Sequence, residues 1–354
     1  MANTAGAVVV GKMSQRLRVP SKTYHLGRGK LEELLALKDS TRYDVVIFDD
    51  ELSPLQQRNL EDFFQVKVID RVALILDIFA RRARTREGQL QVELAQHQYI
   101  FPRLAGQWQH LERLGGGIGT RGPGESQLET DRRLIRQRIH RLQEQLERVR
   151  KHRSLYRQRR KKSGVPIIAL VGYTNTGKST LLNVLSRADV FAENKPFATL
   201  DPTTRRLRLP DNQVVLITDT VGFIRKLPPT ILTAFRATLE ELAEASILLH
   251  VVDFSLHNAA EQCQVVENIL TELNLRDKPR ITALNKIDLL LDSDQIWTEE
   301  EAIDYLSDQS ALLVEDMALI STVKGWGLKK LLELISYVLT KTGSPVKSSK
   351  NDAL

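Results

Sequence analysis

The chain has 354 residues, of which 42% are hydrophobic and 27% are charged, a composition typical of a globular protein with two or three domains. No apolar run approaches the ~20 residues that span a bilayer, the start lacks the features of a secretory signal, and a single cysteine, Cys263, excludes a disulfide framework. The net charge of +7 is concentrated in residues 131–162, which hold 14 Lys or Arg against 3 Asp or Glu. Such a segment favours contact with a polyanion, most often nucleic acid, over a merely solvated helix face.

Residues 1–84 alternate strand and helix patterns, which predicts a small parallel α/β subdomain. The expected strands are 7–10, 44–48 and 66–69, and the expected helices are 30–38, 53–64 and 72–83. The second helix opens with Ser53-Pro54, and Gln56 stands at the capping-box position. The spacing of Gly27-Arg28-Gly29-Lys30 fits no known phosphate loop, so this stretch is interpreted as a turn and helix start.

Residues 85–163 are predicted to form a basic antiparallel helical hairpin. Apolar residues recur at alternating spacings of four and three from Leu90 to Leu111, and at spacings of three, four or seven from Leu128 to Tyr156, which gives two helical seams. His97 on the first seam is expected to be packed, and Pro102 is expected to kink or open that helix.

A glycine-rich stretch, GGGIGTRGPGE, joins the two seams and predicts a tip loop over residues 115–124, with the second helix following from Ser126. A loop almost free of side chains can approach RNA closely, so we hypothesise RNA contacts at Gly116, Gly117 and Arg121, with Arg132 and Arg133 on neighbouring phosphates. The alternative is that the glycines only make a tight turn.

Residues 164–341 open a different domain, in which the strand 167–171 runs into GYTNTGKST at residues 172–180. Gly172, Gly177, Lys178 and Ser179 match the phosphate-loop pattern G-x-x-x-x-G-K-[ST] between a strand and a helix. Backbone N–H groups of this loop wrap phosphate, Lys178 neutralises it, and the Ser179 hydroxyl binds Mg²⁺.

Three further motifs follow in order, each at the end of an expected strand. Asp219-Thr220-Val221-Gly222 places an Asp in the outer shell of Mg²⁺ and a Gly at the γ-phosphate. Asn285-Lys286-Ile287-Asp288 points to guanine, because the Asp288 carboxylate can accept both the ring N–H and the exocyclic amine. Ser321-Thr322-Val323 is placed to reach the guanine carbonyl through its backbone. Together these motifs predict a GTPase, with ligands at the strand ends of an open α/β sheet.

The predicted GTP-binding residues are the members of these four loops and of the expected switch I segment. They are Gly172, Tyr173, Thr174, Asn175, Thr176, Gly177, Lys178, Ser179, Phe197, Ala198, Thr199, Leu200, Asp201, Asp219, Thr220, Val221, Gly222, Asn285, Lys286, Ile287, Asp288, Ser321, Thr322 and Val323.

Two features of these loops bear on catalysis. Phe223 occupies the position after D-x-x-G where many GTPases carry a glutamine that orients the attacking water, which predicts slow hydrolysis without a partner. Asn175 either seats a K⁺ ion near the phosphates or only favours the turn. The switch I threonine that binds Mg²⁺ cannot be chosen among Thr199, Thr203 and Thr204 from the residues alone.

Long stretches of the chain resemble the HflX family of the Obg–HflX group of GTPases, over roughly residues 1–340. They include IFDDELSPLQQRNLE at 47–61, RLGGGIGTRGPGESQLETDRR at 113–133, PFATLDPTTR at 196–205 and DTVGFIRKLPP at 219–229. The resemblance implies that Thr199 binds Mg²⁺, and that Lys178, Thr199 and Gly222 serve catalysis. It also implies a protein that binds the large (50S) ribosomal subunit and its rRNA, is stimulated by it, and acts in ribosome splitting, rescue or quality control.

The sequence therefore predicts a P-loop GTPase domain preceded by a small parallel α/β subdomain and a helical hairpin, with a disordered tail at 342–354. We expect a monomeric cytoplasmic protein, or one of an organelle stroma or matrix, that takes GTP, GDP and Mg²⁺ and has no membrane partner. Two alternatives are a GTP-timed ribosome-assembly factor and a signalling GTPase whose basic arm binds a protein.

Overall fold

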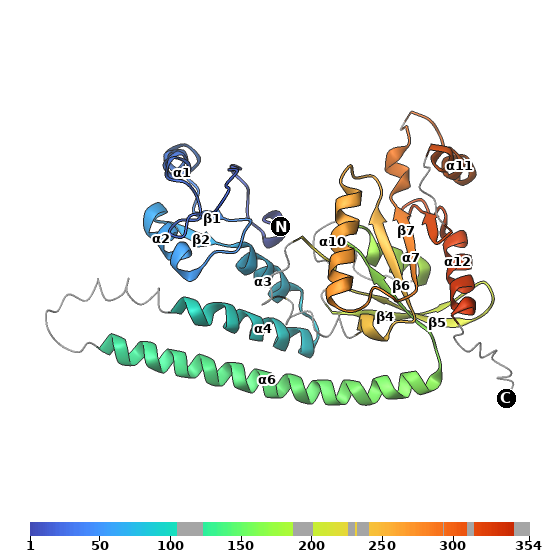
Figure 1. The fold of residues 1–354 in the computed structure, drawn as a ribbon, viewed down its shortest axis with the longest axis horizontal. Coiled ribbons are helices and arrows are strands. Elements are labelled where there is room, and N and C mark those ends of the chain that lie inside the picture. Colours follow the sequence, from blue (N-terminus) through green and yellow to red (C-terminus); the bar gives the residue numbers. More distant parts are fainter. Residues whose placement is uncertain are drawn as a thin grey trace. The chain divides into compact units, whose positions relative to one another are not determined.

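The computed structural model describes residues 1–104, 123–186, 201–225, 231, 241–292, 294–309 and 315–342. At residues 123–128 and 154–163 it describes the backbone alone. The chain divides into two compact units near residue 150. Figure 1 shows the first with helices α1 to α4 and the second with the larger sheet. None of the helices in the described ranges is long and apolar enough to cross a membrane.

The first unit holds a small α/β layer. Its elements, in order, are η1 (Asn3–Ala5), α1 (Arg28–Thr41), β1 (Val45–Ile47), α2 (Pro54–Phe64), β2 (Lys67–Ile69) and α3 (Arg71–Arg82). Strands β1 and β2 pair in parallel, with Val46 opposite Val68. Helix α2 begins with the predicted capping box, in which Ser53 Oγ accepts from the Gln56 N–H and the Gln56 side chain accepts from the Ser53 N–H.

The predicted first strand, Ala7–Val10, is wrong. Val8, Val9 and Val10 are 86%, 56% and 55% exposed. They pair with no strand in the described part of the chain, and the described small sheet of the first unit consists of β1 and β2. An apolar run becomes a strand only when a neighbouring edge takes up its backbone hydrogen bonds. The Gly27–Lys30 stretch is the predicted helix start, since α1 follows N-cap Gly27.

Helices α4 (Arg86–Ile100) and α6 (Pro123–Ser163) form the predicted hairpin. In the first unit they run side by side (Figure 1), and Leu90 and Leu94 of α4 pack with Leu142 and Leu146 of α6. Helix α4 ends at Ile100, because Pro102 lies in the short 3₁₀ turn η2 (Phe101–Arg103), so the first seam does not continue as one α-helix.

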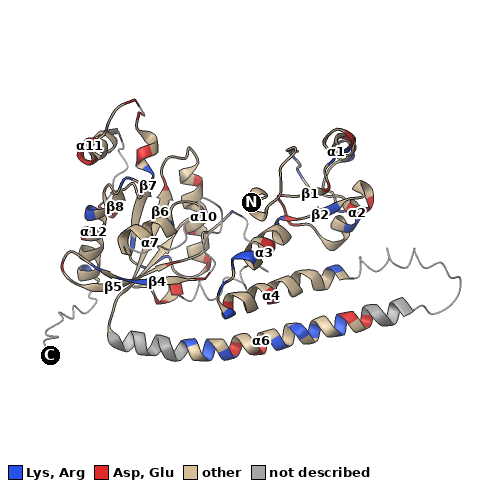
Figure 2. Cartoon of the chain, turned by 180° about the vertical axis from the view of Figure 1, so that it is seen from behind, with Lys and Arg blue, Asp and Glu red and all other residues tan. Residues whose placement is uncertain are grey.

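Helix α6 begins at Pro123, before the predicted start at Ser126, so the end of the predicted tip loop is helical. Proline is well suited to the first turn of a helix, where its missing N–H costs nothing. Gly116, Gly117 and Arg121 lie outside the described residues. Arg132 and Arg133 lie on α6, within the run of Lys and Arg that Figure 2 shows along this helix.

The second unit is built on a six-stranded sheet in the order β4-β5-β3-β6-β7-β8, with only the β4–β5 pair antiparallel. Its strands are β3 (Ile167–Val171), β4 (Thr203–Arg208), β5 (Val214–Asp219), β6 (Ile247–Asp253), β7 (Arg280–Asn285) and β8 (Met317–Leu319). Its helical elements are α7 (Lys178–Ser186), α10 (Ala259–Glu272), η3 (Ile287–Leu290), α11 (Glu299–Gln309) and α12 (Leu328–Lys341).

Strand β3 runs through the centre of this sheet and is buried along its whole length. Ile168 and Leu170 pack into one cluster with α7 and α12, whereas Ile167, Ala169 and Val171 pack into the opposite cluster with α10. This alternation follows from the two-residue period of a strand, and Figure 1 shows helices over both faces. The predicted P-loop GTPase fold is thus confirmed, with the motifs at the carboxyl ends of the parallel strands.

Candidate nucleotide-binding site

The loop 172–177 between β3 and α7 has the close-packed geometry that its glycines predict. A Cβ on Gly172, at φ +148°, would lie 2.2 Å from the Val251 carbonyl oxygen, and one on Gly177, at φ +95°, would lie 2.3 Å from Asn285 Nδ2. Asn175 also adopts a positive φ of 67°. This conformation agrees with the turn interpretation of Asn175.

Lys178 is the first residue of α7 and is only 6% exposed. Its Nζ donates to the carbonyl oxygens of Gly172 at 3.2 Å and Tyr173 at 2.6 Å. Burial lowers the pKa of the Lys178 ammonium to about 8, although the nearby Asp219 carboxylate acts in the opposite direction. A buried cation that folds back on the loop is suited to meet phosphate oxygens there.

Ser179 and Asp219 bring two hard oxygen donors together beside Lys178. Ser179 Oγ donates to Asp219 Oδ2 at 2.6 Å, and Asp219 ends strand β5 with its side chain fully buried. Hydroxyl and carboxylate oxygens suit Mg²⁺, which keeps several waters and needs few protein ligands next to nucleotide phosphates. The donor set therefore fits the predicted ion, with Ser179 as a ligand and Asp219 in the outer shell.

Gly222 lies directly against the phosphate loop. A Cβ there would stand 2.7 Å from Thr174 Cα, so a side chain would force the two loops apart. The next residue, Phe223, donates its N–H to the Gly172 carbonyl at 3.0 Å and accepts from the Thr174 N–H at 2.9 Å. Its ring is 6% exposed and packs in the core cluster of α10, so it does not replace a water-orienting glutamine.

Asn285 joins the phosphate loop to the predicted guanine loops. Its Nδ2 donates to the Thr176 carbonyl at 2.7 Å, and its Oδ1 accepts from the Thr322 N–H at 3.2 Å. Ser321 Oγ donates to Asp288 Oδ1 at 2.6 Å, which orients the carboxylate predicted to read guanine. The structure thus brings the phosphate loop and both guanine motifs to one edge of the sheet.

The sequence analysis missed one residue of this edge, Asp253. Lys286 Nζ lies 2.7 Å from Asp253 Oδ2 and donates to the Asn175 carbonyl at 2.9 Å, so this ion pair ties the ends of β6 and β7 to the phosphate loop. The sequence could have indicated Asp253, because this residue ends an apolar strand just as Asp219 does.

Switch I is only partly described. Phe197, Ala198, Thr199 and Leu200 lie outside the described residues, and Asp201 is the first residue described after them. Thr203 and Thr204 lie in strand β4, where Thr203 stands opposite Asp219 and the Thr204 hydroxyl is 2.9 Å from the Thr218 hydroxyl. The choice of Thr199 for Mg²⁺ therefore stays a prediction.

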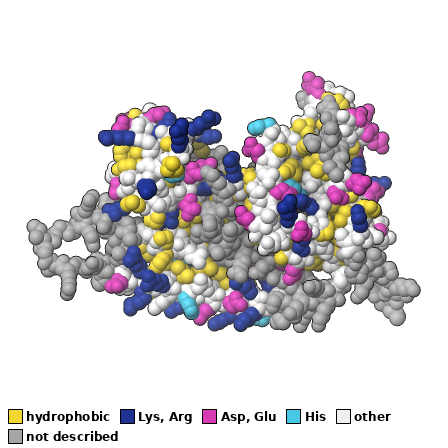
Figure 3. Space-filling view, viewed as in Figure 1, with side chains coloured by type: hydrophobic (Ala, Val, Ile, Leu, Met, Phe, Trp, Pro, Cys, Tyr) yellow, Lys and Arg dark blue, Asp and Glu magenta, His cyan; other side chains and the backbone are white. Residues whose placement is uncertain are grey.

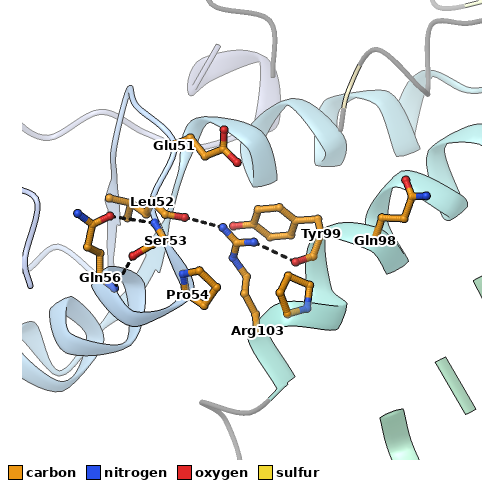
Figure 4. Close-up of a pocket in the computed structure, with 9 residues that line it drawn as sticks. Glu51, Leu52, Ser53, Pro54, Gln56, Gln98, Tyr99 and Arg103 are labelled. Atoms are coloured by element: carbon orange, nitrogen blue, oxygen red, sulfur yellow. Dashed lines mark hydrogen bonds between the residues drawn. The ribbon is translucent and has the colours of Figure 1, made fainter. Parts of the chain in front are cut away.

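The first unit contains an open hollow of about 540 Å³, lined by residues from the α2 start and the end of α4 (Figure 4). At its base, Arg103 donates to the Leu52 carbonyl at 2.7 Å and to Asp70 Oδ2 at 3.2 Å, and its guanidinium stacks 3.6 Å from the centre of the Tyr99 ring. Tyr99 donates to Asp70 Oδ1 at 2.8 Å. Because these polar groups bond to one another and so hold η2 against the start of α2, we assign no ligand to this pocket.

The basic stretch of α6 offers the charge that a polyanion needs. Among its described residues, Arg133, Arg136 and Arg141 are exposed, and Figure 3 shows dark blue side chains gathered at the surface of this helix. Arg138 is exposed as well, but its side chain pairs with Glu93 of α4 at 2.5 Å. The exposed arginines are spaced along one long helix, which suits successive phosphates of a nucleic acid.

Comparison with known protein families covers about four fifths of the chain. Three family models match consecutive parts: "GTP-binding GTPase N-terminal" at residues 1–80, "GTP-binding GTPase Middle Region" at 82–160, and "50S ribosome-binding GTPase" at 167–286.

Curated relatives named GTPase HflX are highly similar. The relative from Caldanaerobacter subterraneus is 55% identical over 82% of this chain and 68% of its own length. Those from Lacrimispora saccharolytica and Escherichia coli are 51% and 49% identical, over 96% and 82% of this chain and 77% and 68% of their own lengths. A solved GTP-binding protein from Sulfolobus solfataricus, in complex with GDP, is 24% identical over 96% of this chain and 93% of its own, with a TM-score of 0.48.

Proposed function

Because the chain belongs to the HflX family of GTPases, we propose that it hydrolyses GTP in a Mg²⁺-dependent reaction on the large ribosomal subunit, in the splitting or rescue of ribosomes. The observation that carries this proposal is the meeting of four loops at one sheet edge: the phosphate loop, the loop with Asp219 and Gly222, and the two guanine loops. The proposal gives the protein a cytoplasmic location, or one in an organelle matrix, where large subunits are found.

The residues of this edge take the following roles in the proposal. Lys178 and the loop amides hold the phosphates, Ser179 and Thr199 bind Mg²⁺, and Asp219 orients its outer shell. When bound, Mg²⁺ neutralises negative charge that develops on the transferred phosphoryl group. Gly222 offers its N–H to the γ-phosphate, and its lack of a side chain lets this loop lie close to Thr174.

Guanine selection falls to Asp288 and Asn285. The Asp288 carboxylate, oriented by Ser321, accepts the two adjacent N–H donors of guanine. Adenine has no donor pair of this geometry, so GTP is the expected nucleotide. Asn285 contributes indirectly, because its side chain connects the phosphate loop at Thr176 to the guanine loop at Thr322.

Hydrolysis is expected to be slow without the ribosome. Phe223 is committed to the core, so its side chain cannot orient the attacking water. A surface brought by the large subunit would have to supply this positioning, which is worth several orders of magnitude in other GTPases. The exposed arginines of α6 and the predicted tip at Gly116, Gly117 and Arg121 are the proposed contacts to rRNA.

The test is steady-state GTP turnover with and without purified large subunits. We expect at least tenfold stimulation in K⁺ buffer, with Asp288→Asn as the matched variant that loses GTP turnover. Replacing K⁺ by Na⁺ distinguishes the two interpretations of Asn175, since a fall in turnover would favour a K⁺ site over a purely structural turn. Turnover unchanged by subunits would exclude the ribosome as activator and favour a signalling GTPase with a protein partner. Binding to immature particles alone would favour an assembly factor.

A further inference from the structure

The second unit exposes a group of apolar side chains that the nucleotide site does not use. They are those of Leu289, Leu290, Ile296 and Tyr305, which are 64%, 39%, 94% and 44% exposed. The first two belong to η3, the last belongs to α11, and Ile296 lies in the segment between these elements. A group of exposed apolar side chains marks a place where a partner binds. We call these four side chains the α11 apolar surface.

Trp297 holds the parts of this surface together. Its ring lies 5.1 Å from the Tyr305 ring, measured between centroids, at an interplanar angle of 45°. Its indole N–H donates to the carbonyl of Asp292, two residues after η3, at 3.2 Å. Because Ile296 directly precedes Trp297, these contacts keep its side chain near α11. The surface is therefore ordered before a partner binds, which lowers the entropic cost of binding.

The other face of α11 is anchored in the core. Ala302 and Leu306 are buried, and Leu306 packs in one cluster with Ile287 and Leu319. Residues four apart lie on the same face of a helix, so this packing leaves Tyr305 to the solvent. Substitutions on the exposed face should consequently leave the fold of the second unit intact.

The segment that carries this surface holds negative charge and no positive charge. Between residues 289 and 308 the sequence has seven acidic residues and no Lys or Arg. All seven are exposed: Asp292, Asp294, Glu299, Glu300, Glu301, Asp304 and Asp308. Figure 3 shows magenta acidic side chains gathered over α11 at the upper right, with yellow hydrophobic side chains between them. This charge is opposite to that of residues 131–162 and repels nucleic acid and anionic membranes.

We propose that the α11 apolar surface binds a protein segment rich in Lys and Arg that also carries apolar side chains, in the form of a basic amphipathic helix. Its apolar side chains cover Ile296 and Tyr305, and its basic side chains meet the surrounding carboxylates. The inference goes beyond the proposed function, which gives the chain an RNA contact through α6 and no contact through α11.

The experiment uses a fluorescent amphipathic peptide with lysines along one helical face and leucines along the other. It is titrated with the full chain and followed by anisotropy. A peptide of the same composition in scrambled order should bind at least about fivefold more weakly, since it has the charge without the apolar face. Ile296→Ser with Tyr305→Ser should weaken binding of the amphipathic peptide at least about tenfold. Tyr337→Ser, at a 60% exposed tyrosine of α12, is the matched control and should bind as the wild-type protein does.

The charge requirement is tested at the same surface. Glu300→Lys with Asp304→Lys should weaken binding of the amphipathic peptide at least about fivefold at low salt, and by less at high salt because salt screens these charges. Glu333→Lys, at an exposed position of α12, is the matched control. GDP affinity should stay unchanged in every variant, which separates a loss of peptide binding from a loss of folding.

Several results would overturn the proposal. They are no peptide binding by the wild-type protein, equal binding of the two peptides, and binding that the double variant at Ile296 and Tyr305 retains. Self-association that this variant abolishes would assign the surface to a second copy, and RNA binding that it weakens would assign the surface to nucleic acid. None of these measurements uses a ribosome, so a failure of large subunits to stimulate GTP turnover would count against the proposed function alone.

Discussion

At the nucleotide-binding edge, Lys178, Asp219 and Asn285 are each no more than 6% exposed and each has named partners within 3.2 Å. On helix α6, Arg133 and Arg136 face solvent. Nucleotide binding at the first region depends on individual side chains, so a single substitution there should abolish it. Binding of a polyanion to α6 depends on the summed charge of many side chains, which salt screens, so a single substitution should weaken it only modestly.

The largest effect is expected for Lys178→Ala. Removing the buried cation should lower the affinity for GDP at least about a hundredfold, or ~3 kcal/mol, since a charge-assisted contact to phosphate is lost. Isothermal titration measures it directly. Lys329→Ala, an exposed lysine of α12, is the control and should bind GDP as the unaltered protein does. A loss below about tenfold would mean that the loop amides alone hold the phosphates.

The packing of the hairpin depends on four buried leucines, so substitution of one of them should lower its stability strongly. Leu142 is fully buried, and Leu142→Ala should destabilise the first unit by about 2–5 kcal/mol. Thermal unfolding of this variant should be compared with that of Leu134→Ala, which alters a 54% exposed leucine of the same helix. GDP affinity should not change; a loss of affinity would show that the hairpin supports the nucleotide site.

A second test of the nucleotide edge is its pH dependence. Because burial lowers the pKa of Lys178 to about 8, and bound phosphate favours the protonated form, GDP affinity should be constant below about pH 8. Above that pH it should fall by up to about tenfold per unit, equivalent to ~1.4 kcal/mol. Lys178→Arg keeps its charge over this range and should give a flat profile.

The lowered pKa of Lys178 affects the stability of the nucleotide-free protein in the opposite direction to GDP affinity. The folded-state pKa lies below the ordinary value of 10.5, so the folded state binds fewer protons, and nucleotide-free protein should gain stability as the pH rises from about 8 to 10.5. A flat profile for both affinity and stability in the unaltered protein would mean that Lys178 keeps an ordinary pKa.

The smallest effect is expected for Arg132→Gln on α6. One phosphate contact fewer should reduce the slope of log affinity against log salt by about 0.7–0.9, with less than ~1 kcal/mol lost at physiological salt. Large-subunit binding over a range of KCl concentrations measures this slope. Adding Arg133→Gln should roughly double the change. Arg28→Gln on α1, whose side chain is 92% exposed, serves as the control for loss of charge elsewhere.

The sequence predicted the nucleotide edge more fully than the first unit. The motif at Gly172–Ser179 has fixed spacing because a phosphate fixes the positions of the groups around it, and the structure brings it together with Asp219, Asn285 and Asp288. The strand at Ala7–Val10 was mispredicted, because an apolar run reveals nothing about which edge, if any, will pair with it.

Ion pairs between residues far apart in the chain could not be predicted from the sequence either. Arg153 is one of 14 basic residues in its segment, and no local pattern marks it as the one that meets a buried Glu241. The two apolar seams of the hairpin were predicted from their leucines, but their register was not. The end of α4 depended on how the chain accommodates Pro102, which sequence spacing leaves open.

Asn285 bears on the rate at which a nucleotide binds. Its amide bridges the Thr176 carbonyl and the Thr322 N–H, so contacts within the protein hold the phosphate loop and the loop at Ser321 in register. Association of a nucleotide then requires no separate assembly of these two loops. We therefore expect GDP and GTP to bind at a rate that is set by diffusion into the site and not by a slow rearrangement of this edge.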